Sequence, residues 1–159
     1  MRVLRPDDLL PQGEGRWTPE TVGNAFAECA RQLRAHLADP EVLRVIVLIG
    51  LPGAGKTTWA GRQAEDPTSV LYDVVNAHPG RRAALARRIR DAGKDAIAVV
   101  VSSPISLCLN RNALRPVWRR VPEAFIRKTA IALRRDPPTV AEGWTRVEHV
   151  DGALIHCSA

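Results

Sequence analysis

Residues 44–57 read RVIVLIGLPGAGKT, a run of β-branched residues that leads into a glycine-rich turn and then into lysine and threonine. The apolar part is typical of a strand buried in a parallel sheet. From Gly50 to Thr57 the chain matches the phosphate-loop pattern, two glycines with four residues between them, followed by Lys and Thr. This pattern belongs between a strand and a helix. The segment therefore predicts an α/β fold that binds a nucleoside triphosphate.

Each position of this loop has a chemical task in that prediction. Glycines let backbone N–H groups turn toward phosphate oxygens, and the Lys56 ammonium reaches the β- and γ-phosphates. The Thr57 hydroxyl is the expected Mg²⁺ ligand, and the helix that starts near Lys56 adds the positive end of its dipole. The expected cofactors are ATP and Mg²⁺, although no base-reading motif separates ATP from GTP. The expected nucleotide-binding residues are Gly50, Pro52, Gly53, Ala54, Gly55, Lys56, Thr57 and Thr58.

The flanking segments alternate between strand and helix patterns. This alternation predicts a three-layer α/β fold of the P-loop NTPase and kinase type, with a mainly parallel sheet of four or five strands, helices on both faces and an Arg-rich lid. Apolar runs predict further strands, and helical periodicity with capping residues predicts the helices. The expected strands are 44–49, 70–75, 96–102, 146–150 and 154–157, and the expected helices are 18–38, 56–64, 79–92, 105–114 and 123–135.

The first forty residues have a different character. Residues 1–16 contain two prolines and two glycines and are expected to be irregular. The helix after them has one apolar stripe, so we expect residues 1–40 to be an N-terminal extension with one amphipathic helix. Residues 41–159 are then the kinase-like domain, with a lid over about 105–128. The stripe consists of Val22, Phe26, Cys29, Leu33 and Leu37.

Composition limits the class of protein. The chain has 159 residues, a net charge of +6 and three cysteines without Cys-x-x-Cys spacing, a pattern that does not indicate a disulfide framework or a zinc ribbon. No apolar run approaches the length that spans a membrane. We therefore expect a cytoplasmic protein with no membrane partner. The basic balance favours an anionic partner, such as a nucleotide or a nucleic acid.

Five segments, in order, resemble the polynucleotide 5′-hydroxyl kinase family. The loop GLPGAGKTTWA corresponds to the family's phosphate loop, and the later segments correspond to its D-x-x-N-x-x-P-x-R-R segment, its lid core R-N-x-x-R, its V-P-x-x-x-I-R stretch and its closing E-G strand. The resemblance covers about residues 44–150. Its segments here are 50–60, 73–82, 107–115, 121–127 and 142–147.

The resemblance implies a set of catalytic residues: Lys56, Asp73, Arg111 and Arg115. The two arginines are four positions apart, so one helix face would present both to the phosphates. The lid region supports this, because eight basic residues and one Glu lie between Arg111 and Arg135. Asp73 is the expected base that activates the acceptor hydroxyl.

The base is where the sequence departs from the family. Larger members carry a D-x-x-R segment on the strand that follows the phosphate-loop helix, and the residue three positions after Asp73 is Asn76. Either Asp73 replaces the missing acid, or the base lies elsewhere and Asp73 binds a metal-bound water or caps a helix. Asp66 is a weaker alternative.

Three functions are consistent with these observations. The first is a kinase for a hydroxyl on nucleic acid, either a 5′ end or a hydroxymethyl group of a modified base, as in phage DNA hypermodification. The second is a small-molecule kinase that acts on a nucleoside, a sugar or an antibiotic. The third is a nucleotide-binding regulator or toxin that uses the helix of residues 18–38 as a partner surface.

Overall fold

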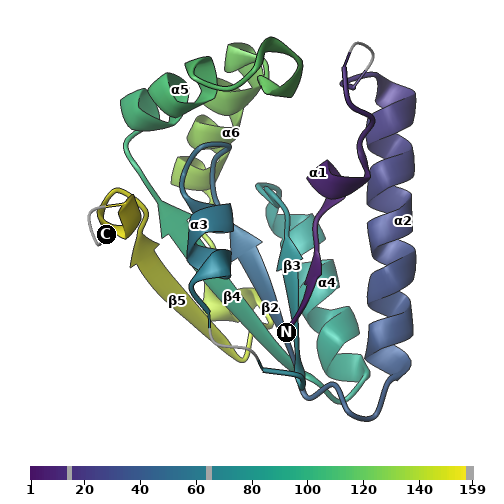
Figure 1. Cartoon of the computed structure of the whole chain (residues 1–159). Helices are drawn as coiled ribbons and strands as arrows, with labels where there is room; N and C mark the ends of the chain where they lie inside the picture. Colours follow the sequence, from purple (N-terminus) through teal and green to yellow (C-terminus); the bar gives the residue numbers. More distant parts are fainter. Residues whose placement is uncertain (14–15, 64–65, 157–159) are drawn as a thin grey trace.

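The computed structural model describes residues 1–13, 16–63 and 66–156. Its centre is one sheet of five parallel strands in the order β1-β3-β2-β4-β5 (Figure 1). The alternating α/β architecture expected from the sequence is confirmed at this level. The strands are β1 (Arg2–Leu4), β2 (Arg44–Ile49), β3 (Ser69–Asp73), β4 (Asp95–Ser102) and β5 (Arg146–Asp151).

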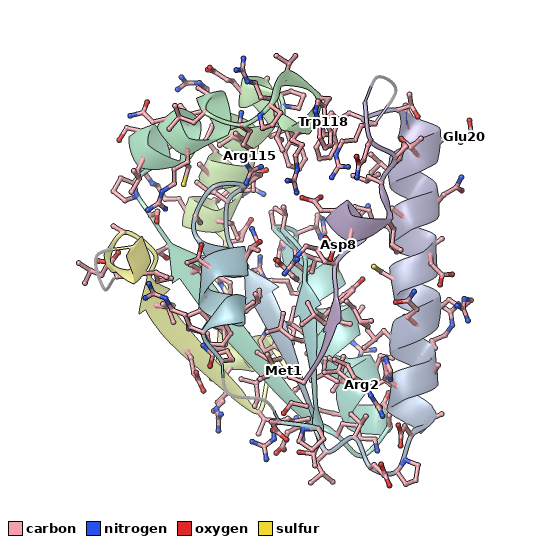
Figure 2. The ribbon with its side chains drawn as sticks, in the orientation of Figure 1. Met1, Arg2, Asp8, Glu20, Arg115 and Trp118 are labelled. Atoms are coloured by element: carbon pink, nitrogen blue, oxygen red, sulfur yellow. The ribbon has the colours of Figure 1, made fainter. Side chains whose placement is uncertain are left out.

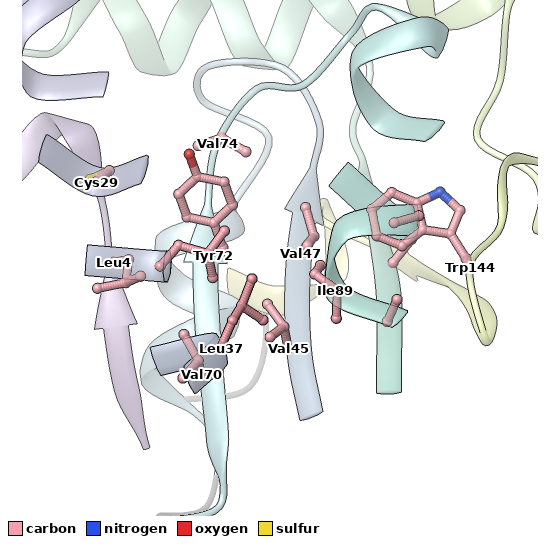
Figure 3. Close-up of a cluster of buried hydrophobic side chains, with 14 of the residues drawn as sticks. Leu4, Cys29, Leu37, Val45, Val47, Val70, Tyr72, Val74, Ile89 and Trp144 are labelled. Carbon is pink, nitrogen blue, oxygen red and sulfur yellow. The ribbon is translucent and has the colours of Figure 1, made fainter. Parts of the chain in front are cut away.

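Helices cover both faces of the sheet. Alternate residues of β2 point to opposite faces, so Val45 and Val47 pack with the helices of one face while Leu48 packs with those of the other. Figure 3 shows the first cluster, in which Cys29 and Leu37 of α2 and Ile89 of α4 cover the strands. The helices are α1 (Pro6–Leu9), α2 (Pro19–Ala38), α3 (Lys56–Gly61), α4 (Pro79–Asp91), α5 (Ile105–Ala113) and α6 (Glu123–Arg135), with 3-10 turns η1 (Val117–Arg119), η2 (Val140–Glu142) and η3 (Leu154–His156).

The N-terminal segment differs from its expectation. Residues 1–16 were expected to be irregular, but Arg2–Leu4 forms β1, which pairs in parallel with β3, and Leu4 lies in the core. The strand has three residues, too few to show a periodic pattern, and its partner lies almost seventy positions later. The segment 1–40 is therefore joined to the sheet of residues 41–159 through an edge strand.

Three elements also differ from their expected boundaries. The strand expected over 70–75 is β3, which ends at Asp73. The expected strand over 154–157 is instead the 3-10 turn η3, because Asp151 Oδ1 accepts the Ala153 N–H at 2.8 Å and turns the chain out of the sheet; Cys157 lies outside the described residues. The helix expected over 56–64 ends at Gly61, and Ala64 is also outside them. No helix in the described part of the chain is long and apolar enough to cross a bilayer.

A buried ion pair joins two of the segments that carry the family resemblance. The Arg82 side chain of α4 is fully buried, and its Nε donates to Glu142 Oε2 at 2.8 Å. The same guanidinium donates to the carbonyls of Ala77 and Asp136, and Trp144 Nε1 donates to Glu142 at 3.0 Å. These residues anchor α4 to the start of β5, so they have a structural task away from the loop at the ends of β2 and β3.

Removing one member of this pair should strongly destabilise the protein. Glu142→Ala leaves the Arg82 guanidinium buried without a counter-charge, and we expect a loss of about 3–5 kcal/mol in the free energy of unfolding. Chemical denaturation measures it. The control is Glu148→Ala in the exposed Arg146–Glu148 pair, which should change stability little. Equal losses in both variants would contradict this assignment.

Candidate active site

A cavity of about 650 Å³ lies where β1, β2 and β3 end. Ligand sites of open α/β sheets are expected at this edge. One wall is the N-terminal segment with α2, the floor is the glycine-rich loop with the end of β3, and the other wall is α5 and the segment that leads into α6 (Figures 1 and 2). In Figure 2, Arg115 and Trp118 lie across the opening from Asp8 of α1.

The glycine-rich loop has a conformation that few other residues could adopt. Gly53 has a φ of 84°, and a Cβ on it would lie 2.7 Å from the Cys108 carbonyl oxygen. Gly55 has a φ of 105° and immediately precedes α3. Gly50 approaches β4 so closely that a Cβ would overlap the Val101 carbonyl. The loop is therefore held between β4 and α5.

The predicted loop residues divide into two groups. Pro52, Gly53, Gly55, Lys56, Thr57 and Thr58 line the cavity. Gly50 and Ala54 support the loop from behind, and the Ala54 carbonyl accepts the Ser103 hydroxyl at 3.0 Å. Lys56 Nζ donates to the carbonyls of Gly50 and Leu51, both at 3.0 Å. Burial lowers the pKa of Lys56, and the nearby carboxylates of Asp73 and Asp7 oppose that shift.

Asp73 is the last residue of β3 and lies beside the loop. Only 6% of the residue is exposed, and its Oδ2 accepts Arg5 Nε at 2.9 Å and Thr57 Oγ1 at 3.3 Å. Asp73 is thus paired with a cation and in contact with the Thr57 hydroxyl. Asp66, the weaker alternative, precedes β3 at the opposite end of the strand, where it accepts from Thr68 and Ser69. It is not part of the site.

Two site residues were missed from the sequence, and both follow β1. Arg5 pairs with Asp73, and Asp7 lines the cavity opposite the lid. Asp7 acts electrostatically on Arg115 as well as on Lys56: burial lowers the pKa of Arg115, and Asp7 opposes that shift. The signal in the sequence is the acidic pair Asp7-Asp8 after Pro6. Its meaning depends on the pairing of β1 with β3, which local patterns do not reveal.

The two lid arginines reach the cavity in different ways. Arg111, on α5, donates to the carbonyls of Gly53 at 3.0 Å and Gly152 at 3.4 Å, so it ties the lid to the loop. Arg115 follows the end of α5 at Ala113, so the two do not share one helix face as expected. Both line the cavity, but the Arg115 guanidinium has no hydrogen-bond acceptor among the described residues.

Arg16 connects the two walls. Its guanidinium lies between the rings of Trp17 and Trp118, 5.3 and 5.5 Å from their centroids, and donates to the carbonyls of Asp7, Leu10 and Pro11. Trp118 belongs to η1 in the lid, whereas Asp7 and Leu10 belong to the N-terminal segment. The buried Arg16 side chain therefore contacts both the N-terminal segment around Asp7 and the lid.

Three further residues near these elements have structural positions. His78 caps α4, with Nδ1 accepting the Gly80 N–H at 3.1 Å. Cys29 and Cys108 are buried free thiols. Within the described ranges, no group of three or more His, Cys, Asp or Glu side chains could hold a metal by itself.

Comparison with known proteins adds no assignment. No protein-family model matches the chain, and the search of curated proteins finds no match. The resemblance to polynucleotide 5′-hydroxyl kinases consequently depends on the sequence motifs alone.

The contacts of Arg16 predict that the stability of the N-terminal segment depends on its attachment to the lid. Arg16→Ala removes three charged hydrogen bonds and the stack on Trp118, so we expect unfolding to become easier by about 2–4 kcal/mol. Hydrogen exchange over residues 6–10 should also become faster. Arg119→Ala is the matched control. Arg119 is exposed, and its guanidinium stacks on the same Trp118 ring, 5.6 Å from the ring centroid. This dependence is contradicted if both variants behave alike.

Proposed function

We propose that this chain has a P-loop fold and is an ATP-dependent phosphotransferase with a hydroxyl group as acceptor. One observation carries the proposal. The same cavity is lined by the Lys and Thr of a phosphate loop, by two lid arginines and by two carboxylates, Asp73 at the end of β3 and Asp7 in α1 after the neighbouring strand β1. A protein that only binds nucleotide has no need of the second carboxylate. A transferase needs it beside the acceptor.

The loop side of the cavity fits a triphosphate with Mg²⁺. The Thr57 hydroxyl already contacts Asp73, the arrangement in which a loop Thr and a strand-end Asp hold Mg²⁺ in P-loop enzymes. Bound Mg²⁺ would neutralise charge on the β- and γ-phosphates. Lys56 is within the loop, and Arg115 lines the cavity without a protein acceptor, so both are suited to bind phosphate oxygens.

The two carboxylates suit different tasks. Asp73, expected to be the base, is paired with Arg5 and Thr57, which supports a role on the metal side. Asp7 lines the cavity from α1, directly after the adjacent strand β1, and acts electrostatically on Lys56 and Arg115. This position is suited to the acid that the resemblance implies and that the segment after α3 lacks. We assign Asp7 as the base.

The phosphoryl group is then transferred in one step. The acceptor oxygen attacks the γ-phosphorus as its proton passes to the Asp7 carboxylate. The bond between the γ-phosphorus and the bridging oxygen breaks, and ADP leaves with the electron pair. Arg111 and Arg115 stabilise charge on the transferred group.

Two classes of acceptor follow from different observations. Exposed basic residues on the lid and α6 support a hydroxyl on nucleic acid, at a 5′ end or on a hydroxymethylated base; they are Arg119, Arg120, Arg127 and Lys128. The lining of the cavity supports a small-molecule acceptor. The regulator or toxin alternative is weakened because α2, its supposed partner surface, forms a wall of the cavity.

Free thiols support a cytoplasmic setting.

Substitution of the two acids should separate their roles. Asp7→Asn should lower kcat by about 10²–10⁴ with ATP affinity unchanged, because only the proton acceptor is lost. Asp73→Asn should instead raise the Mg²⁺ concentration needed for half-maximal rate. Transfer of labelled γ-phosphate, with Lys56→Ala as the loss-of-binding control, measures both. If Asp73→Asn is inactive at saturating Mg²⁺ and Asp7→Asn is active, Asp73 is the base.

The arginines should separate by stability. Arg115→Met should lower kcat by about 10²–10³ without lowering the melting temperature, because its guanidinium has no acceptor in the described protein. Arg111→Met should lower both, because it also loses its bonds to the Gly53 and Gly152 carbonyls. Thermal melting and the same transfer assay distinguish them. A stability loss limited to Arg115→Met would contradict these roles.

A further inference from the structure

The cavity has an apolar half that the proposed chemistry does not use. It lies between the N-terminal wall and the segment from the lid into α6. Its lining includes Trp17, Val22 and Phe26 on one side, Val121 and Phe125 on the other, and Val75 beyond the end of β3. The sequence predicted Val22 and Phe26 as part of one apolar stripe on this helix, but the buried residues of α2 are Ala25, Cys29, Leu33 and Leu37. The first turns of that stripe face the cavity instead.

Two aromatic rings in this half remain uncovered by protein. Phe26 is 44% exposed and Phe125 is 47% exposed, and they come from α2 and α6 on opposite walls. Exposed apolar side chains in a concave site are typical of ligand binding, because a bound apolar surface removes them from water. Aromatic side chains on both walls favour a flat ligand.

The charged residues that line the cavity come from the N-terminal segment, the glycine-rich loop, the end of β3 and the lid, whereas the lining residues of the apolar half are uncharged. The charged lining residues are Arg5, Asp7, Lys56, Asp73, Arg111 and Arg115. The exposed cations of the lid, such as Arg119 and Arg120, are not among the lining residues. A phosphodiester chain requires cations along its path. The apolar half therefore suits an uncharged group.

Trp17 also lines this half and carries an unpaired polar group. Its indole Nε1 is buried and has no hydrogen-bond partner among the described residues. A buried N–H without a partner is unfavourable. A ligand that carries a carbonyl oxygen or a ring nitrogen would satisfy it. The cavity volume of about 650 Å³ is in the range of small-molecule sites.

We propose that the apolar half binds the phosphoryl acceptor, and that this acceptor is an uncharged small molecule with a planar aromatic body, a hydrogen-bond acceptor for Trp17 and a hydroxyl directed toward Asp7. This inference depends on the proposed function and names its substrate class. Uncharged nucleosides have each of these parts and are the first compounds to test.

The test compares two acceptors in one assay. Full-length protein with ATP and Mg²⁺ is offered a panel of nucleosides or a single-stranded 5′-hydroxyl oligonucleotide, and labelled phosphate on each is measured at two salt concentrations. Binding of the same nucleosides is measured separately by ligand-observed NMR in the presence of a non-hydrolysable ATP analogue. We expect saturable binding and labelling of nucleosides, with little dependence on salt.

Variants locate the acceptor in the apolar half. Phe26→Ala and Phe125→Ala should each raise the nucleoside KM at least tenfold and leave the KM for ATP within about twofold. Phe26→Arg should abolish nucleoside binding, because it places an uncompensated charge in the apolar half. Ile131→Ala is the control: it lies on α6, like Phe125, but is 69% exposed and outside the cavity lining. Melting temperatures show whether each variant is folded.

Each other result has a defined meaning. Labelling of the oligonucleotide alone, with steep loss at high salt, would overturn the small-molecule inference and leave the phosphotransferase proposal intact. Loss of ATP affinity in Phe26→Ala and Phe125→Ala would assign the apolar half to the donor base and overturn it as well. Failure of every nucleoside to bind beside the ATP analogue would also overturn it. Absence of ATP binding in the wild type would instead contradict the proposed function itself.

Discussion

The parallel pairing of β1 with β3 is the constraint on which the site depends. The pairing of three residues, Arg2 to Leu4, sets the position of the segment directly after them, which includes Arg5 and α1. Because parallel strands end at the same edge, Arg5 and Asp7 emerge beside Asp73. The Arg5–Asp73 ion pair then joins the two strand ends, and Thr57 joins the pair to the glycine-rich loop. Without β1, the cavity would lose one acid, one wall and the partner of Asp73.

The distribution of charge follows from this arrangement. The chain is strongly basic, yet its acids within the fold are paired where burial would otherwise penalise them: Asp73 with Arg5, and Glu142 with Arg82. The Arg115 guanidinium, by contrast, is half-buried without a hydrogen-bonded partner in the described part of the chain. Burial lowers its pKa. An unpaired cation in a cavity is a destabilising feature unless an anion binds there. The site thus combines the Arg5–Asp73 ion pair with one unpaired cation, Arg115, that is available to bind an anionic ligand.

The segments that resemble one kinase family have unequal roles. The loop lines the cavity and Arg111 holds it, whereas Arg82, Glu142 and Trp144 form a buried network that fixes α4 against the start of β5. Residues that recur together in a pattern can therefore reflect packing as well as chemistry. Arg16, which belongs to none of these segments, links the acidic turn to the lid through three carbonyls and Trp118.

The sequence by itself determined the features that depend on neighbouring residues. The β2 run, the glycine-rich loop and most helix boundaries follow from local pattern and propensity. Only the tertiary structure decided that residues 2–4 form an edge strand, that Asp7 and Arg5 enter the site, and that Phe26 faces a cavity. Those outcomes depend on contacts between residues tens of positions apart, and a three-residue strand or one side of an amphipathic helix carries no local signal of its distant partner.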